Sequence, residues 1–263
     1  ISQSGESLDT LKAMNYAAKK KLTTIALVNV PDSTIARNSD VILATKAGPE
    51  IGVASTKAFT AQLTVLISLA IAIAEAKNEI TVDQSNELQR KIRLLPGLVG
   101  KTLDCFDVIK PIASGLKSAS SALFLGRGYL FPIALEGALK LKELSYIHAE
   151  GFAAGEMKHG PIALIEEGLP VIALLANDNL MEKVISNLKE AAARGARIIL
   201  IADERAAVEI DFAAEVVTVP AVDPLLAPIL LTIPVQILAY LTALDKGTDI
   251  DQPRNLAKSV TVE

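Results

Sequence analysis

Cysteine, tryptophan and histidine are scarce in this chain of 263 residues. Cys105 is the only cysteine, so no disulfide can form within the chain, and such sparse use is typical of a reducing, cytoplasmic compartment. We interpret Cys105 as an ordinary buried or half-buried thiol, because no helix start or cationic group frames it. Aromatic residues make up only 4% of a sequence that is 51% hydrophobic. Richness in Ala, Leu, Ile and Val favours alternating strands and helices over a β-sandwich.

Long runs of one charge are also missing. The net charge is −4 and both signs are mixed along the chain, so a nucleic-acid partner has little support. No secretory signal pattern opens the sequence. Two uncharged runs, 58–74 and 224–244, are candidates for membrane spans, and the second is long enough. Because the second contains Pro228, Pro234 and Gln236 and lacks a positively charged flank, we predict a buried core helix and no membrane partner.

The hydrophobic pattern predicts strands that alternate with helices. The first half is expected to contain a helix at 8–21, a strand at 22–28, a helical turn at 33–37, a strand at 40–45 and a helix at 58–77. Two charged helices, 81–95 and 98–117, follow, broken near Pro96-Gly97 and Pro111. The second half is expected to contain strands at 121–126, 169–175, 196–202 and 215–219, and helices at 132–150, 178–194 and 225–244.

The two halves read as one unit used twice. Residues 2–45 and 176–219 share the order turn, helix, strand, short helix, strand at a nearly constant shift. The fold class is therefore α/β, with a parallel sheet sandwiched by helices in each of two domains. The second half carries an extra strand and helix at 121–150, so we expect the first domain to be truncated at its N-terminus. We predict a first domain at 1–80, a helical linker at 81–117, a second domain at 118–246, and a tail at 247–263 that covers the site.

The predicted helix at 132–150 combines charge with an apolar surface. Glu136, Lys140 and Glu143 share one helix face. The other faces are apolar, so we expect a helix packed on most sides and a charged row that lines a cleft. For Glu143 the alternative is a helix-surface ion pair with Lys140. Proton transfer by such groups requires no metal and no cofactor, and no metal-ligand cluster or cofactor loop is visible in the sequence.

Both histidines follow that charged row. His159 lies between Gly155 and Gly160 in a loop that we expect to be shaped for function, with backbone capping as the alternative. His148 is placed on the apolar helix and interpreted as structural. The stretch from Glu136 to His159 thus brings several candidate general acids and bases together.

The turn at residues 2–7 suits an anion. It stands before a predicted helix start, where free N–H groups and the helix dipole attract phosphate. Gly5 lets the backbone approach closely, and the turn carries the hydroxyls of Ser2, Ser4 and Ser7 and the amide of Gln3. The turn contains no lysine, which excludes the nucleotide P-loop pattern. The alternative is a simple helix cap at Ser4, but the matching turn of the second copy carries Asp178, which caps equally well and repels phosphate.

Five stretches carry a family resemblance: ISQSGES (1–7), EIGVASTKAFTAQL (50–63), LFLGRG (123–128), ALEGALKLKELSYIHAEGFAAGEMKHGP (134–161) and DQPRNLAKSVTVE (251–263). They resemble the isomerase half of the glutamine–fructose-6-phosphate aminotransferase family, which is a pair of sugar-isomerase (SIS) domains. The resemblance implies amino-sugar synthesis in the cytoplasm. Fructose 6-phosphate is opened, ammonia adds at C2, and the imine isomerises to glucosamine 6-phosphate.

The resemblance also implies residue roles. Glu143 is the base that moves the proton between C1 and C2, with Lys140 beside it. His159 opens the ring and comes from the partner subunit of a homodimer, and Lys258 serves ring opening or imine chemistry. The remaining residues match positions that bind the sugar phosphate: Ser2, Gln3, Ser4, Ser7, Val53, Ser55 and Ala257.

The chain also departs from the family pattern. Nothing in it corresponds to the glutamine-hydrolysing domain with its nucleophilic cysteine, so that glutaminase domain is an expected partner in the full-length protein. The first domain lacks its opening strand and helix, where the family has a further phosphate loop. Two alternatives stay open: a plain ketose/aldose phosphate isomerase, and a sugar-phosphate-binding regulatory SIS domain, which would need neither base nor tail lysine.

Overall fold

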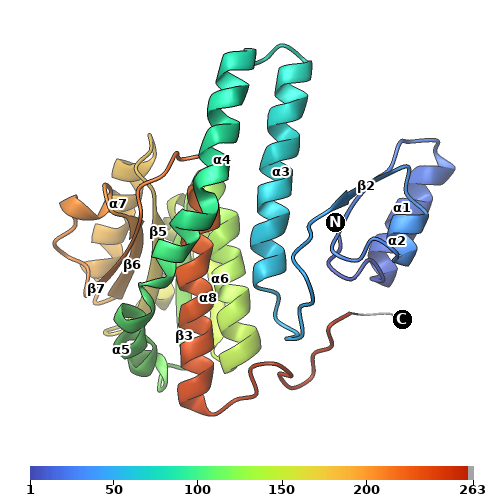
Figure 1. The fold of residues 1–263 in the computed structure, drawn as a ribbon. Coiled ribbons are helices and arrows are strands. Elements are labelled where there is room, and N and C mark those ends of the chain that lie inside the picture. The colour runs from blue at the N-terminus through green and yellow to red at the C-terminus, as the bar shows by residue number, and fades with distance from the viewer. Residues whose placement is uncertain (260–263) are drawn as a thin grey trace. The chain divides into compact units, whose positions relative to one another are not determined.

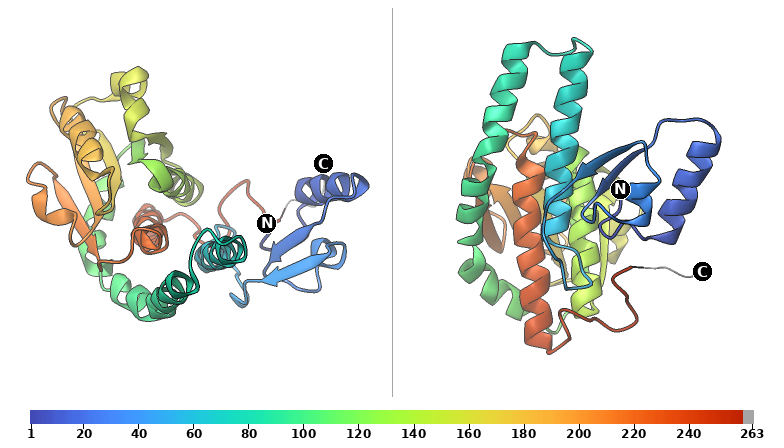
Figure 2. Two further views of the ribbon diagram at one scale, coloured as in Figure 1. Left: turned by 90° about the horizontal axis from the view of Figure 1, so that it is seen from above. Right: turned by 45° about the vertical axis from the view of Figure 1, so that its right-hand side comes forward.

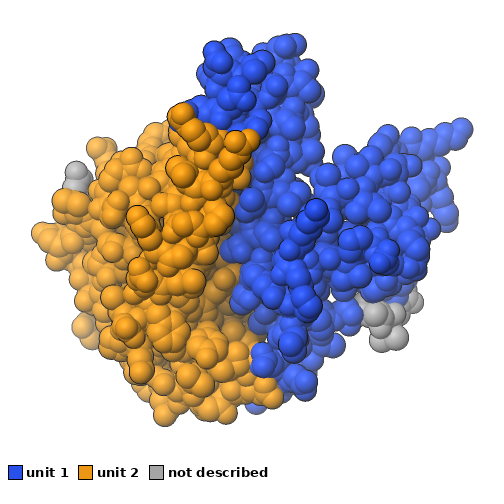
Figure 3. Space-filling view, in the orientation of Figure 1, with its two compact units in different colours: residues 1–89, 251–263 blue, residues 90–250 orange. Residues whose placement is uncertain are grey.

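The computed structural model describes residues 1–259, which fall into two compact units (Figure 3). Unit 1 comprises residues 1–89 together with the tail from Asp251, and unit 2 comprises Arg90–Ile250. Residues 260–263, the end of the predicted tail, lie outside the described residues. The four-part domain division made from the sequence remains a prediction.

Unit 1 contains a small parallel sheet (Figure 1). Its elements are α1 (Leu8–Lys19), β1 (Ile25–Val28), α2 (Thr34–Arg37), β2 (Val41–Ala44) and α3 (Lys57–Ala76). The two strands pair in parallel from Ile25↔Val41 to Val28↔Ala44, and Ser2 adds an isolated parallel bridge to Val28. The core is correspondingly small, since it consists of Ala26, Val28, Ile35 and Ala36 with Leu11 and Met14 packed against them.

Two helices follow α3 along the chain, α4 (Val82–Leu103) and α5 (Phe106–Leu116). The predicted breaks at Pro96 and Pro111 were wrong, because both prolines lie inside continuous helices. Pro96 is exposed, so the carbonyl that it leaves without a helical partner can face water. The chain instead turns at Asp104 and Cys105, and Cys105 therefore stands directly before a helix start, contrary to expectation. Burial raises the pKa of its thiol to about 11, so it remains an inert buried group.

Unit 2 is built on a five-stranded sheet in the order β4-β3-β5-β6-β7, and every pairing is parallel. The strands are β3 (Ser121–Gly126), β4 (His148–Ala153), β5 (Pro170–Leu175), β6 (Arg197–Asp203) and β7 (Glu215–Val219). Central β5 is buried at every position, as expected of a parallel strand covered on both faces. The helices are α6 (Phe131–Ser145), α7 (Met181–Ala192) and α8 (Ala227–Lys246), and four 3-10 turns are η1 (Gly128–Leu130), η2 (Ala154–His159), η3 (Pro161–Leu164) and η4 (Ala207–Glu209).

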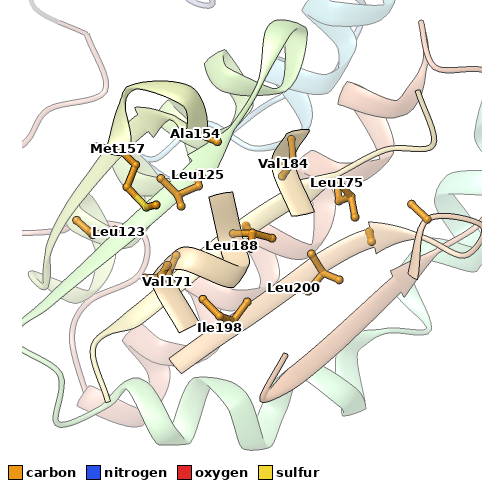
Figure 4. Packing of buried hydrophobic residues seen from close by; sticks show 14 of the residues in the cluster. Leu123, Leu125, Ala154, Met157, Val171, Leu175, Val184, Leu188, Ile198 and Leu200 are labelled. Atoms are coloured by element: carbon orange, nitrogen blue, oxygen red, sulfur yellow. The ribbon is translucent and has the colours of Figure 1, made fainter. Parts of the chain in front are cut away.

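Helices cover both faces of this sheet (Figure 2). On one face α7 and η2 pack on a cluster that includes Leu125, Met157, Val171 and Leu188 (Figure 4). On the other face α6 and α8 pack against each other, and α5 packs on α8. The α/β class with a sheet between helices is confirmed, and the second sheet carries more strands than the first, as predicted.

The two long apolar helices differ in burial. Both have the length and a mean hydropathy of 1.8 that a membrane span requires. For α8, 78% of the most apolar window is buried, which confirms the predicted core helix. For α3 only 11% is buried. The core role that apolar composition indicated therefore holds for α8, while α3 keeps much of its apolar surface partly exposed.

One strand was missed by sequence reasoning. The helix predicted at 132–150 ends at Ser145, where Tyr146 takes a left-handed conformation with φ 61°, and β4 follows. Strand β4 pairs with β3 from Ser121↔His148 to Gly126↔Ala153. Gly151 allows this strand to lie against α6, since an added Cβ would come within 2.9 Å of Leu135 Cα.

The predicted repeat is present as a sequence of elements. In unit 1 the order is α1, β1, α2, β2, and in unit 2 it is α7, β6, η4, β7. The preceding strand β3, helix α6 and strand β4 of unit 2 have no counterpart before α1. Each copy begins at a turn that leads into its first helix, so the two turns can be compared directly.

Candidate active site

The turn at residues 2–7 is held by its own backbone and hydroxyls. Ser2 donates its N–H to Leu27 O at 3.0 Å, and Asn29 donates its N–H to Gln3 O at 3.1 Å, which ties the turn to the end of β1. The Ser2 hydroxyl accepts the Gly5 N–H at 3.0 Å and lies 3.3 Å from the Ser7 hydroxyl. Ser2 is buried, whereas Gln3, Ser4 and Ser7 are half-buried. The turn thus presents polar groups at the carboxyl end of a parallel strand, where ligands bind in open α/β sheets.

Gly5 is required by this geometry. Its φ of +68° is a left-handed conformation that residues with a Cβ rarely adopt. A Cβ at this position would also lie 1.9 Å from the Ser33 hydroxyl oxygen. The close approach to α2 therefore leaves room only for glycine.

The simple capping alternative does not describe the turn. Ser7, not Ser4, stands at the N-cap of α1, and its side chain makes no capping hydrogen bond. The Ser4 hydroxyl accepts the Glu6 N–H at 3.2 Å. The Glu6 carboxylate accepts the Thr34 N–H at 2.7 Å at the start of α2, and this hydrogen bond lowers the Glu6 pKa. The Ser7 side chain thus leaves the first-turn N–H groups of α1 uncapped, and such groups at a helix N-terminus attract anions.

The matching turn in unit 2 is closed by a carboxylate. Asp178 accepts the Leu180 N–H at 2.8 Å ahead of α7 and the Tyr129 hydroxyl at 2.6 Å. Burial and then this carboxylate raise the pKa of Tyr129, so the phenol stays protonated. Both carboxylate oxygens of Asp178 thus already accept a hydrogen bond, and their negative charge would repel a phosphate.

The charged row on α6 is assembled as the helical spacing predicted. Lys140 Nζ lies 2.6 Å from Glu143 Oε2 and 3.6 Å from Glu136 Oε1. The exposed fractions of the three side chains are 5% for Lys140, 12% for Glu136 and 20% for Glu143. The ion pair that the alternative expected is therefore present, but it is largely buried, and an ammonium buried this deeply requires its partners.

The pKa of Glu136 is raised. Its burial is the largest cause, the Lys140 charge opposes it, and the Glu143 charge raises the pKa further. Burial therefore outweighs the favourable charge of Lys140, and Glu136 holds its proton more readily than an exposed carboxylate does. The row is a buried acid–base cluster whose outermost member is Glu143.

The row's helix is less enclosed than predicted. Leu135 and Leu139, one turn apart on α6, are 44% and 42% exposed. The expectation of packing on most sides was therefore wrong for this stripe, because the sheet and α8 cover only part of the helix surface. His159 ends η2 and is exposed, next to Gly160.

His148 does not lie on the apolar helix, because the helix has ended before it. It is the first residue of β4, its side chain is 71% exposed, and its Nε2 lies 3.5 Å from Glu150 Oε1. A histidine this exposed is not a core residue. Its place at the start of an edge strand explains the difference.

The tail lysine is held within unit 1. Lys258 Nζ donates to Gly52 O at 2.6 Å and lies 3.2 Å from Glu50 Oε2. The hydroxyl of Ser55 donates to the same carboxylate oxygen at 2.8 Å. Val53 donates its N–H to Asp251 O at 2.9 Å, so loop and tail are joined by backbone as well. Ala257 is exposed beside Lys258.

Glu50 is the residue that sequence reasoning missed. Its carboxylate is 5% exposed and joins three predicted elements: the loop at Ser55, the start of α3 and the tail at Lys258. The sequence did contain one signal: Glu50 is the first residue of the stretch EIGVASTKAFTAQL, and it lies shortly before the helix predicted at 58–77. Among residues 1–259, no group of three or more His, Cys, Asp or Glu side chains is placed to hold a metal ion.

Comparison with known proteins decides the family. The chain matches the SIS domain over residues 1–72 and 115–245. The chain belongs to the SIS domain family. This SIS chain is 52% identical over 264 residues to the glutamine–fructose-6-phosphate aminotransferase (isomerizing) of Zymomonas mobilis and 53% identical over 266 residues to that of Agrobacterium fabrum. Both alignments cover the whole chain and 44% of the relative, so the chain spans less than half the length of these proteins.

Two solved structures show the same SIS architecture. The C-terminal domain of glucosamine-fructose-6-phosphate aminotransferase from Francisella tularensis superposes with a TM-score of 0.92 at 43% identity, over 95% of this chain and 71% of that one. Glucosamine-6-phosphate deaminase from Thermotoga maritima superposes with a TM-score of 0.78 at 27% identity, over 98% and 73%. The SIS domains described here are thus similar to proteins that are named for amino-sugar phosphates.

Proposed function

We propose that this chain converts fructose 6-phosphate and ammonia to glucosamine 6-phosphate. The observation that carries the proposal is similarity along the entire chain to the isomerizing aminotransferases, together with an acid–base row on α6. Ammonia adds at the C2 carbonyl of the opened sugar, water leaves, and the resulting imine shifts a proton from C1 to C2. That shift needs one carboxylate that reaches both carbons and a fixed anchor for the phosphate.

The residues divide these tasks. The turn with Ser2, Gln3, Ser4 and Ser7 takes the phosphate, because its hydroxyls and N–H groups attract a dianion. Glu143 takes the proton from C1 and returns it to C2. Lys140 holds Glu143 from one side at 2.6 Å, which supports a fixed base on a rigid helix.

The remaining residues handle the ring and its nitrogen. His159 serves ring opening, since an exposed imidazole can both give and accept a proton near neutral pH. Lys258 serves ring opening or imine chemistry at the tail. Val53, Ser55 and Ala257 complete the contacts to the sugar, and the sugar phosphate is the small-molecule partner.

The assay incubates the protein with fructose 6-phosphate, with and without ammonium, and measures glucosamine 6-phosphate and glucose 6-phosphate. Glucosamine 6-phosphate formed only with ammonium supports the proposal. Glucose 6-phosphate formed without ammonium would favour a plain isomerase. Binding of the sugar phosphate with neither product would favour a regulatory SIS domain and contradict an enzyme.

A second candidate is the reverse reaction. The Thermotoga neighbour named as a deaminase is 27% identical over nearly the whole chain, and deamination uses the same proton transfer between C1 and C2. Incubation with glucosamine 6-phosphate alone distinguishes the two candidates. A deaminase should release ammonium from this sugar under conditions in which synthesis of glucosamine 6-phosphate from fructose 6-phosphate and ammonium is slow.

We also propose a homodimer, and the glutaminase domain as a partner in the full-length protein. Support for the dimer comes from α3, an apolar helix of which little is buried. If His159 serves the neighbouring subunit's sugar, mixing inactive His159→Gln and Glu143→Gln proteins restores part of the activity. Mixed dimers that stay inactive, with exchange verified by mass spectrometry, would place His159 in its own subunit's site.

A further inference from the structure

The buried carboxylate of Glu50 contacts both Lys258 in the tail and the loop with Val53 and Ser55, which we name the sugar loop because these two residues are predicted to contact the sugar. Glu50 Oε1 accepts the N–H groups of Thr56 at 2.8 Å and Ala58 at 3.2 Å, which lie at the start of α3. These two backbone donors fix the plane of the carboxylate. Only 5% of the side chain is exposed, so solvent does not compete for its second oxygen.

The second oxygen serves two side chains. Glu50 Oε2 accepts the Ser55 hydroxyl at 2.8 Å and lies 3.2 Å from Lys258 Nζ. Lys258 also donates to Gly52 O at 2.6 Å. Two acceptors in fixed positions orient an ammonium far better than one, because each removes a rotational freedom of the long side chain.

The carboxylate is maintained in its ionised form. Burial raises the pKa of Glu50, but the hydrogen bonds from Thr56, Ala58 and Ser55 and the charge of Lys258 together outweigh burial and lower it. A charge that is buried and satisfied in this way is a fixed feature of the loop and not a mobile surface group.

We propose that Glu50 is the positioning residue for Lys258: its buried carboxylate, locked to the start of α3, sets where the tail amine stands relative to the sugar loop. The inference deepens the proposed function and rests on it, since Lys258 acts on sugar only if the chain is the proposed enzyme. Glu50 touches no reacting atom. It acts through Lys258, and it couples that lysine to Ser55, which shares its oxygen.

Glu50→Gln separates positioning from folding. The amide oxygen of glutamine can still accept from Thr56 and Ala58, and its NH2 group can donate to the Ser55 hydroxyl. The NH2 group cannot accept from an ammonium, so Lys258 loses one of its two acceptors and keeps only Gly52 O. We expect kcat to fall about a hundredfold while KM for fructose 6-phosphate stays within about threefold, because the amine is misplaced but the phosphate anchor is untouched.

Two further variants complete the test. Glu50→Asp keeps the charge on a shorter side chain and should rescue part of kcat, to about tenfold below the wild type. Asp40→Asn is the matched control: Asp40 in unit 1 also accepts a backbone N–H, from Thr24 at 2.8 Å, but pairs with no lysine in the described part of the chain. It should leave kcat unchanged. Wild-type kcat in Glu50→Gln, with the wild-type protein active, would overturn the positioning role and leave the proposed function standing.

A readout without turnover covers the case in which the proposed function fails. Brief acetylation with acetic anhydride, followed by mass spectrometry, compares Lys258 with Lys246 as internal reference. Glu50→Gln should raise the relative labelling of Lys258 several-fold. An inactive wild type together with raised labelling would refute the enzyme and retain the pairing, whereas unchanged labelling would overturn the pairing itself.

Discussion

The two turns that open the repeated unit differ in chemistry although their surroundings are alike. Each stands before a helix and a parallel strand pair, α1 with β1 and β2 or α7 with β6 and β7. The first holds serine hydroxyls around a left-handed Gly5, and the second is saturated by Asp178. Unit 1 thus carries the polar turn that we propose as the phosphate site, while unit 2 carries the buried acid–base row on α6. The same order of helices and strands thus occurs twice, while the residues of the two turns, such as Gly5 and Asp178, give them different chemistry.

The largest expected effect separates chemistry from anchoring. Glu143→Gln keeps the size of the side chain and its contact with Lys140, but it removes the proposed base. We expect the rate of glucosamine 6-phosphate formation to fall about a thousandfold or more, which is the scale of general-base catalysis. The coupled assay with ammonium measures it. A variant that retains a tenth of the rate would assign Glu143 a structural role.

Substitution in the first turn tests whether its shape is specific. Gly5→Ala forces a Cβ against Ser33 at a φ of +68°, and should destabilise the protein by about 2 kcal/mol and abolish phosphate binding by the turn. Gly48→Ala is the matched control, because Gly48 has a φ of +71° but open space around it. Its denaturant midpoint should shift less, and its titration with inorganic phosphate should match the wild type. If both variants lost phosphate binding equally, backbone strain at a positive φ would explain the loss, and the shape of the turn at residues 2–7 would not.

The second turn should respond differently. Asp178→Ser removes the acceptor for the Tyr129 hydroxyl and weakens the start of α7, so we expect a loss of about 1 kcal/mol in the free energy of unfolding. It should gain no affinity for phosphate, because it lacks the glycine-based geometry of the first turn. If Asp178→Ser did bind phosphate in a titration, this expectation would be wrong, and the carboxylate of Asp178 alone would explain why the second turn binds no phosphate.

The smallest effect concerns pH. The pKa of Glu136 is raised above its ordinary value of 4.5, so the folded protein binds more protons than the unfolded chain between the two pKa values. The contribution to stability is therefore complete below the unfolded pKa and is lost as pH rises through the folded pKa. Urea unfolding across this window should show the wild type losing stability with rising pH relative to Glu136→Gln. Parallel curves would contradict the raised pKa.

Buried runs of the chain were predictable from sequence, because their pattern is local. Strands β3 and β7 begin and end where the hydrophobic pattern predicted, and the spacing of Glu136, Lys140 and Glu143 assembled the row. The end of α6 was not predictable. Tyr146 adopts a left-handed conformation without any glycine or proline to signal it, because pairing of the following residues with β3 overrides helix propensity.

Glu50 was hidden for a related reason. Its contact with Lys258 joins residues 208 positions apart, which no local pattern records. Pro96 shows the opposite failure, since a strong local signal predicted a break that the structure does not have. Sequence reasoning thus identified individual candidate groups, whereas their partners depend on tertiary contacts.

The division of labour between anchor and base is tested most directly by calorimetric titration of fructose 6-phosphate into Glu143→Gln and Gly5→Ala, with the wild type alongside. If Glu143 serves only proton transfer, Glu143→Gln binds the sugar phosphate with a Kd within about threefold of the wild type while its turnover is lost. Gly5→Ala should bind at least about tenfold more weakly. Loss of binding in Glu143→Gln as large as that in Gly5→Ala would contradict the proposed roles, because the row on α6 would then serve binding and not proton transfer.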